Sequence, residues 1–248
     1  MSDKASIFSV LDQLRQGAAS ERDKGERFER LMVAYLRTDP QYADLYSNVW
    51  MWAEWPGHGK IPDTGIDLVA QERYTSRLCA IQCKFYDPDY NLQKADIDSF
   101  FTASGKSRFS SRMIICTTDH WSNHAEEALE NQATPVVRLR VQDLDDSPVD
   151  WGVFSLDRPQ DLKLREKKRT REHQKEALNN IKAGFKKGDR GKLIMACGTG
   201  KTFTALRLAE DLVGTDGAVL FMVPSLSLLS QALREWTAQA EVPLRCFA

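Results

Sequence analysis

Three polar side chains interrupt two apolar runs in the stretch PDTGIDLVAQERYTSRLCAIQCKFYD, residues 62–87. Asp67 stands near the start of the first run, and Gln82 and Lys84 interrupt the second. Residues two apart on a strand project from one face, and Asp67 joins Gln82 and Lys84 there if the two strands pair. Hard oxygens that hold a divalent cation, beside a lysine that offsets developing charge, suit phosphodiester hydrolysis.

Each of these residues also has a structural interpretation. Asp67 suits an exposed position beside a turn, and Lys84 suits an edge strand, where a charge discourages pairing with other chains. Taken singly, the residues do not decide between the two interpretations. Their order and spacing together favour a catalytic site.

A second group of residues has the spacing of a phosphate-binding loop. The run CGTGKT, residues 197–202, lies between an apolar run and a helical pattern, as such a loop requires. Gly198 and Gly200 allow the backbone around Thr199 to turn its N–H groups toward phosphate oxygens, and the next helix adds its positive end. Lys201 is expected to reach the β- and γ-phosphates of ATP, and Thr202 to hold Mg²⁺.

The elements that must position the first group follow from hydrophobic spacing. The predicted helices cover residues 5–16, 23–37, 94–106 and 124–132. The predicted strands cover residues 48–55, 65–72, 77–86, 112–118 and 135–141. Strands that are followed by a β-α-β-like half predict an α/β fold with a mixed sheet flanked by helices.

The composition changes after residue 148, and six Lys or Arg residues fall between 163 and 171. We predict one domain over residues 1–150, a basic linker over 151–170 and an incomplete α/β domain over 171–248. In that last domain, residues 172–188 read as a helix. The ranges 191–213 and 217–236 each read as strand, turn and helix.

The first domain resembles the PD-(D/E)xK nucleases over about residues 20–145, and DTGIDLVA followed by IQCK is similar to their Mrr-like subgroup. The resemblance implies that Asp67 binds the metal, Gln82 replaces the second acid and Lys84 is the catalytic lysine. It further implies that Glu29, in GERFERLM, adds to the metal site, and that the carbonyl of Cys83 is a backbone ligand.

The departure from the usual motif lies at Gln82, which is neutral and removes one negative charge from the site. Metal binding is then weaker or depends on help from Glu29. Asp63, in the adjoining turn, is a further candidate. We expect Asp67, the Cys83 carbonyl and Glu29 to hold Mg²⁺, Lys84 to assist an attacking water, and Gln82 to orient that water or a metal ligand.

The second domain resembles superfamily 2 helicases and restriction-enzyme motors, through MACGTGKT, REHQKEAL and LFMVPSLSLLSQALREW. The resemblance implies that Gln174 bonds the adenine of ATP with help from Arg171. It also implies that Ser225 and Gln231 touch a DNA backbone. Met195 departs from the pattern, since it stands where the P-loop motif has its first glycine.

No D-E-x-H pattern follows residue 224, so we expect an N-terminal fragment of a longer protein. Such a fragment binds nucleotide weakly without hydrolysing it. A nuclease ahead of a motor is similar to ATP-dependent restriction enzymes, and Type ISP single-chain restriction–modification enzymes fit best. That resemblance implies translocation on double-stranded DNA, with methyltransferase and target-recognition domains further along.

Two other classes of protein remain open. One is a helicase–nuclease of DNA repair or phage defence without methylation. The other is a non-catalytic module in which the nuclease fold binds DNA or supports the motor. The recognition sequence, the trigger for cleavage, the type of cut and the oligomeric state are not set by the sequence.

The composition describes an ordinary globular protein, with 42% hydrophobic and 28% charged residues and a net charge of −1. The five cysteines form no C-x-x-C pair, which favours reduced thiols in a cytoplasm. The start of the chain lacks the pattern of a signal peptide. Its longest apolar stretch is too short to span a bilayer, so we expect no membrane partner.

Overall fold

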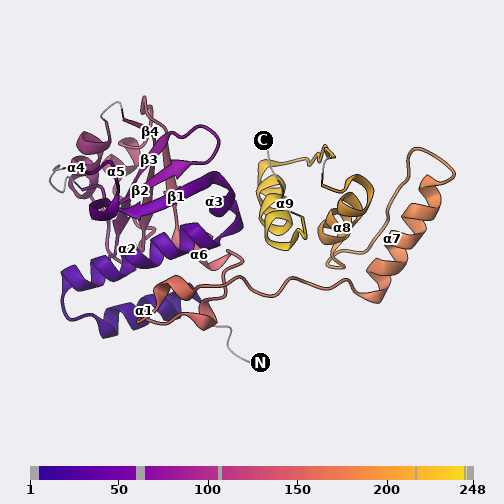
Figure 1. Ribbon diagram of the computed structural model, residues 1–248, viewed down its shortest axis with the longest axis horizontal. Coiled ribbons are helices and arrows are strands. Elements are labelled where there is room, and N and C mark those ends of the chain that lie inside the picture. The colour runs from indigo at the N-terminus through magenta and orange to yellow at the C-terminus, as the bar shows by residue number, and fades with distance from the viewer. Residues whose placement is uncertain (1–5, 60–64, 106–107, 216, 243, 245–248) are drawn as a thin grey trace. The chain divides into compact units, whose positions relative to one another are not determined.

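The computed structural model describes residues 6–59, 65–105, 108–215, 217–242 and 244 (Figure 1). The chain divides into two compact units, residues 1–165 and residues 166–248. No helix in these described ranges is both long and apolar enough to cross a membrane.

One mixed sheet forms the centre of the first unit, with the strand order β1-β2-β3-β4-β5. The strands are β1 (Tyr46–Met51), β2 (Leu68–Glu72), β3 (Leu78–Lys84), β4 (Phe109–Cys116) and β5 (Val136–Leu139). The first two pairs are antiparallel and the last two are parallel. Parallel neighbours need a crossover, which α4 (Ala95–Ser104) and α5 (Asn123–Glu127) supply. This arrangement confirms the predicted fold class of this unit.

The helix α2 (Glu21–Thr38) packs on one face of the sheet, against β1 and β3, and α1 (Ile7–Gly17) packs against α2. Ser20 caps α2, because its side chain accepts the Asp23 N–H. The residues Phe28, Leu31 and Met32 recur at helical spacing and are fully buried. Their burial stabilises the unit by about 1.5–3 kcal/mol for each side chain.

The opposite face of the sheet carries a second core, built with α4 and α5. Neighbouring residues of one strand divide between the cores: Leu68 belongs to the first and Val69 to the second. In β3, Ile81 belongs to the first core and Ala80 to the second. The period of two therefore assigns each side chain of β2 and β3 to one face.

Three short elements differ from the sequence-based expectation. The helices α3 (Pro40–Leu45) and α6 (Val141–Asp145) were not predicted, because six and five residues carry no helical period. The strand expected to reach residue 55 ends at Met51, and the 3₁₀ turn η1 (Trp52–Glu54) follows. The backbone N–H of Trp52 donates to the Asp67 carbonyl at 2.7 Å, which ties this turn to the start of β2.

The first unit extends past the predicted boundary at residue 150, through η2 (Trp151–Val153) and η3 (Pro159–Asp161). Trp151 is 2% exposed, and its ring stacks on Tyr35 with centroids 5.9 Å apart. Residues 151–165 thus differ from the expected linker, because Trp151 and Leu162 are buried in the first core and the Asp150 N–H donates to the Lys163 carbonyl at 2.8 Å. The basic residues Lys167 and Lys168 lie in the second unit, where they bond Ala240 and Glu235.

The second unit contains α7 (Glu172–Phe185), α8 (Lys201–Val213) and α9 (Leu226–Gln239). Helices α8 and α9 pack through Leu206 and Trp236. The indole N–H of Trp236 donates to the Thr202 carbonyl at 3.0 Å, which joins the start of α8 to α9.

The two strands predicted before α8 and α9 are wrong for the part of the second unit that the structure describes, where no strand is assigned. The apolar side chains of these segments are exposed instead: Ile194 is 84%, Leu220 85% and Met222 81% exposed. The physical reason is pairing, because a parallel strand is held by neighbours and is buried on both faces. Neither segment has such a neighbour among the residues that the structure describes.

Candidate functional site

Asp67 lies at the junction where β2 begins beside the end of β3. Its N–H donates to the Ile81 carbonyl at 3.0 Å, so the antiparallel pairing continues one residue beyond β2. Its carboxylate Oδ2 accepts the backbone N–H of Cys83 at 2.7 Å. The register pairs Leu68 with Ile81, so Asp67 lies beside Gln82. The aspartate is therefore positioned by both strands.

Gln82 is a buried polar residue within β3, with only 1% of its surface exposed. Its Nε2 donates to the Gly65 carbonyl at 3.1 Å. Its Oε1 is buried and has no hydrogen-bond partner within the described part of the chain. Such an acceptor is costly, because burial removes its water without replacing it, so it calls for an explanation.

Lys84 is the last residue of β3 and is half-buried. Its carbonyl accepts the N–H of Thr117 at 3.0 Å, and it pairs with Cys116 in the parallel register. Because Ala80, Gln82 and Lys84 alternate along one strand, they project from one face. Lys84 is thus on the Gln82 side of β3.

The Cys83 thiol reports which charges lie around this end of the sheet. Burial raises the pKa of the Cys83 thiol well above its usual value. The carboxylates of Asp67 and Glu29 raise this pKa further, and the Lys84 ammonium opposes them. All three charges therefore act on one buried thiol, and the charge of Glu29 acts from α2.

Packing holds α2 close to the end of β3. Phe28 precedes Glu29 and is fully buried, and its ring meets Phe85 edge to face at 5.2 Å. Phe85 directly follows Lys84. The structure thus places Asp67, Gln82 and Lys84 at one end of the sheet. Glu29 lies on α2 and acts on the Cys83 thiol through its charge, and its place in the site stays a prediction. Asp63 lies outside the described residues.

The donors at this strand end fit a hard divalent cation, although acidic groups are few. Among the described residues, no group of three or more His, Cys, Asp or Glu side chains could hold a metal ion. The oxygens available are the Asp67 carboxylate, the partnerless Gln82 Oε1 and backbone carbonyls. Oxygen donors of this kind suit Mg²⁺, which keeps several of its waters.

Sequence reasoning missed Gly65, whose carbonyl holds the Gln82 amide. Its backbone has a φ of +84°, in the left-handed region that favours glycine. The available signal was a glycine inside the polar motif, two residues before Asp67.

In the second unit, the phosphate loop has the backbone expected of its glycines. Gly198 and Gly200 have φ angles of +76° and +84°, and Gly200 caps the start of α8. The Lys201 ammonium donates to the carbonyls of Met195 and Ala196 at 3.3 and 3.2 Å. Thr202 stands in the first turn of α8. The predicted phosphate contact of Lys201 and the predicted Mg²⁺ contact of Thr202 stay predictions.

Gln174 connects the start of α7 to this loop. It is 5% exposed, its Oε1 accepts the Arg171 N–H at 2.9 Å, and its Nε2 donates to the Thr199 carbonyl at 2.9 Å. Both ends of the amide are therefore engaged within the chain. The predicted bond to adenine requires an exchange of one of them and stays a prediction.

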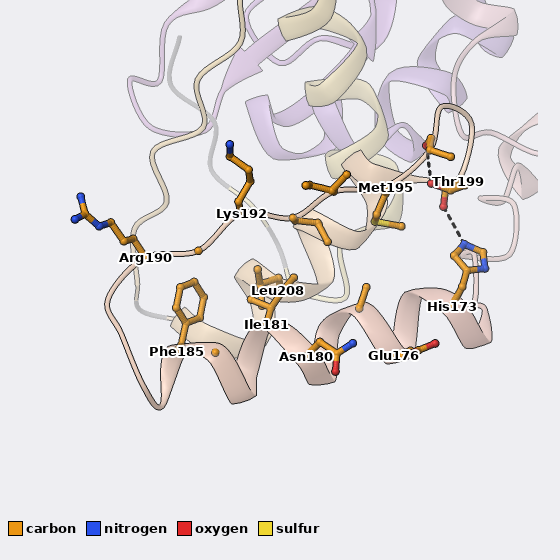
Figure 2. Close-up of a pocket in the computed structure, with 16 residues that line it drawn as sticks. His173, Glu176, Asn180, Ile181, Phe185, Arg190, Lys192, Met195, Thr199 and Leu208 are labelled. Carbon is orange, nitrogen blue, oxygen red and sulfur yellow. Dashed lines mark hydrogen bonds between the residues drawn. The ribbon is translucent and has the colours of Figure 1, made fainter.

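A cavity of about 750 Å³ lies beside the loop, between α7, residues 190–196 and α8. Figure 2 shows His173 at one end of the cavity, pointing to the Thr199 carbonyl, and Phe185 at the other end. Ile181 and Leu208 line its floor with apolar surface. Its volume is in the range of small-molecule sites.

The polar groups predicted to contact DNA lie on α9. Ser225 caps this helix, since its side chain accepts the Leu228 N–H at 3.3 Å. Gln231 is exposed. The structure thus gives Ser225 a capping role, and the predicted DNA contacts of both residues stay predictions.

Comparison with known proteins divides the chain in the same order. Residues 37–161 match the restriction endonuclease family of Mrr catalytic domains. Residues 167–244 match the family described as the res subunit of Type III restriction enzymes. No curated protein sequence matches the chain.

Among solved structures, the chain is similar to the ATP-dependent Type ISP restriction-modification enzyme LlaBIII bound to DNA, with a TM-score of 0.79 and 36% identity. The match covers 94% of this chain and 15% of that enzyme, so the chain spans less than a sixth of its length.

Two further matches are weaker. The DNA modification-dependent restriction endonuclease AspBHI has a TM-score of 0.38 and 12% identity, over 55% of this chain and 33% of that one. The MspJI restriction endonuclease in complex with a 27-mer oligonucleotide has a TM-score of 0.40 and 16% identity, over 58% and 31%.

The family matches confirm the predicted order of a nuclease domain followed by a helicase-like part. The nuclease match covers half of the chain. The chain belongs to the restriction endonuclease family of Mrr catalytic domains and continues into a helicase-like segment.

Proposed function

We propose that the first unit is a Mg²⁺-dependent endonuclease that hydrolyses phosphodiester bonds of double-stranded DNA. The observation that carries the proposal is that Asp67, Gln82 and Lys84 lie together where β2 and β3 pair. The charge of Glu29 acts on the buried thiol of Cys83, which lies between Gln82 and Lys84 in β3. Membership of a restriction endonuclease family supports the same reaction.

In this proposal each residue has the role that its chemical group allows. Asp67, Glu29 and the Cys83 carbonyl hold Mg²⁺, which when bound supplies positive charge to the scissile phosphate. Lys84 assists an attacking water and offsets charge that develops in the transition state. Gln82 presents Oε1 to that water or to a metal ligand.

The helicase-like segment adds ATP as a second ligand in our proposal. The loop from Gly198 to Thr202 binds the phosphates, and the adjoining cavity of about 750 Å³ takes the nucleoside. LlaBIII is an ATP-dependent restriction-modification enzyme that was solved bound to DNA. By similarity, cleavage in the whole protein follows ATP-driven translocation, and methyltransferase and target-recognition functions accompany it.

A second candidate is a nuclease fold that binds DNA without cutting it. The observations that favour it are the neutral Gln82 and the lack of a three-residue acidic cluster among the described residues. The two candidates differ in whether Asp67 and Lys84 are needed for hydrolysis.

The experiment is nicking of supercoiled plasmid by the chain with Mg²⁺ or Mn²⁺, beside Asp67→Ala and Lys84→Ala. We expect the wild type to nick and both variants to be inactive. Equal nicking by all three proteins would mean a contaminant. An inactive wild type that still binds DNA would favour the non-catalytic module.

A further inference from the structure

We propose that Gly65 is a positioning residue for the nuclease site. Its carbonyl orients the Gln82 amide so that Oε1 faces the site, and it makes a hydrogen-bond donor obligatory at position 82. This inference rests on the proposed function, because it assigns a task to the oxygen that Gln82 presents there.

The amide orientation follows from the two ends of Gln82. Its Nε2 donates to the Gly65 carbonyl at 3.1 Å, and its Oε1 is buried without a hydrogen-bond partner in the described residues. A flipped amide would press Oε1 against the Gly65 carbonyl, and two acceptors repel each other. The carbonyl thus selects the orientation that directs oxygen away from Gly65.

The backbone of Gly65 lies close against α4. The φ of Gly65 is +84°, and a Cβ there would lie 2.8 Å from Ser99 Oγ and 3.4 Å from the Phe100 nitrogen. Both atoms belong to α4, whose Phe100 side chain is fully buried in the second core. A side chain at position 65 would be strained by the positive φ and would crowd Ser99, so we expect it to shift the backbone that holds Gln82.

The contact explains why a neutral residue occupies the place of the usual acid. A glutamate at position 82 could donate to the Gly65 carbonyl only by taking up a proton, which would remove the negative charge that it would bring to the metal. At 1% exposure in the absence of a bound metal, burial would itself favour the protonated carboxyl over the charged one. Glutamine supplies the donor to Gly65 without any change of protonation.

The first test replaces Gln82 by Glu in the full chain. Melting is followed in EDTA, and Mn²⁺ binding is followed by calorimetry. Opposed buried acceptors should lower the melting temperature in EDTA by about 4 °C or more. Mn²⁺ should bind about tenfold more weakly than to the wild type, in spite of the added charge.

The second test replaces Gly65 by Ala, with Gly59→Ala as the matched control. Gly59 also has a positive φ, of +61°, but a Cβ there has nothing within 4 Å. We expect Gly65→Ala to weaken Mn²⁺ binding about ten- to hundred-fold and Gly59→Ala to leave it unchanged. Ser99→Gly, added to Gly65→Ala, should restore part of the Mn²⁺ affinity by making room for the new methyl group.

A Gln82→Glu protein that melts like the wild type and binds Mn²⁺ more tightly would overturn the proposal. So would equal Mn²⁺ affinities for Gly65→Ala and Gly59→Ala. If the wild type bound no Mn²⁺, the proposed function would fail, and the orienting role would fail with it. Melting in EDTA would still decide separately whether position 82 needs a donor.

Discussion

The two units present their functional residues on different kinds of support. In the first unit, Asp67 and Lys84 stand at the ends of paired strands with a buried core on each face. In the second unit, the loop around Thr199 lies between segments that pair with no strand in the described residues. Ile194, in the segment before the loop, is 84% exposed.

This difference teaches how each site is held in place. Backbone pairing sets the register of β2 and β3, so Asp67 and Gln82 are neighbours whatever their own side chains do. The loop is held mainly by side chains that bond backbone carbonyls: Gln174 and His173 bond Thr199, and Lys201 bonds Met195. Substitutions should therefore act in different ways in the two units.

The largest effect should come from chemistry at the strand ends. Replacing Lys84 by Ala should lower the initial rate of plasmid nicking by about 10²–10⁴-fold, the range for a positioned proton-transfer group. Lys94→Ala is the control, since Lys94 is an exposed residue that pairs with Asp98 on α4. A Lys84→Ala protein with the wild-type rate would remove Lys84 from the mechanism.

The next largest effect is a loss of stability, which should differ between a buried isoleucine of the first unit and an exposed isoleucine of the second. Ile81 is fully buried in β3, so Ile81→Ala should destabilise the first unit by about 2–5 kcal/mol. Ile194 is 84% exposed, so Ile194→Ala should change the second unit by less than about 0.5 kcal/mol. Hydrogen exchange followed by mass spectrometry reports the opening of each unit separately. Equal losses of stability in Ile81→Ala and Ile194→Ala would contradict the difference in packing between the two units.

A smaller effect is expected for ATP. Lys201→Ala removes a charged donor from the phosphate loop, which corresponds to about 1.5–3 kcal/mol and so to about ten- to hundred-fold weaker binding. Titration with Mg·ATP under calorimetry measures this, and Lys187→Ala, at an exposed position, is the control. Unchanged affinity in Lys201→Ala would show that the loop does not hold the phosphates.

The smallest effect should follow Gln174→Ala. The substitution removes two hydrogen bonds, each worth about 1 kcal/mol, while His173 remains beside the Thr199 carbonyl. We expect faster hydrogen exchange over residues 197–202, with Asn179→Ala on the exposed face of α7 as the control. Identical exchange in the two variants would mean that Gln174 does not hold the loop.

The sequence contained enough information for the sheet but not for its details. The apolar periods of β2 and β3 predicted two strands, and the spacing of Gln82 and Lys84 predicted a shared face. The Gly65–Gln82 bond could not be predicted, because it depends on a left-handed residue held against α4. Trp151 likewise joins the core through one ring, without any pattern around it.

In the second unit, the strands were predicted wrongly and the backbone of the phosphate loop was predicted correctly. The residues around Ile194 and Leu220 have strand-forming side chains, yet strand formation is decided by pairing, which a local pattern does not contain. The phosphate loop was predictable because its glycines serve the backbone of the loop itself: Gly198 and Gly200 have positive φ angles. Local conformation can be predicted from local sequence, whereas pairing depends on distant residues.

The most direct test of the central claim is Mn²⁺ binding without nucleotide, measured by electron paramagnetic resonance on the wild type and Asp67→Asn. Asp67→Asn keeps the shape of the side chain and removes its charge, and Asp189→Asn, at an exposed position of the second unit, is the control. The account predicts one Mn²⁺ site that is lost in Asp67→Asn and kept in Asp189→Asn. Full Mn²⁺ binding by Asp67→Asn would contradict it.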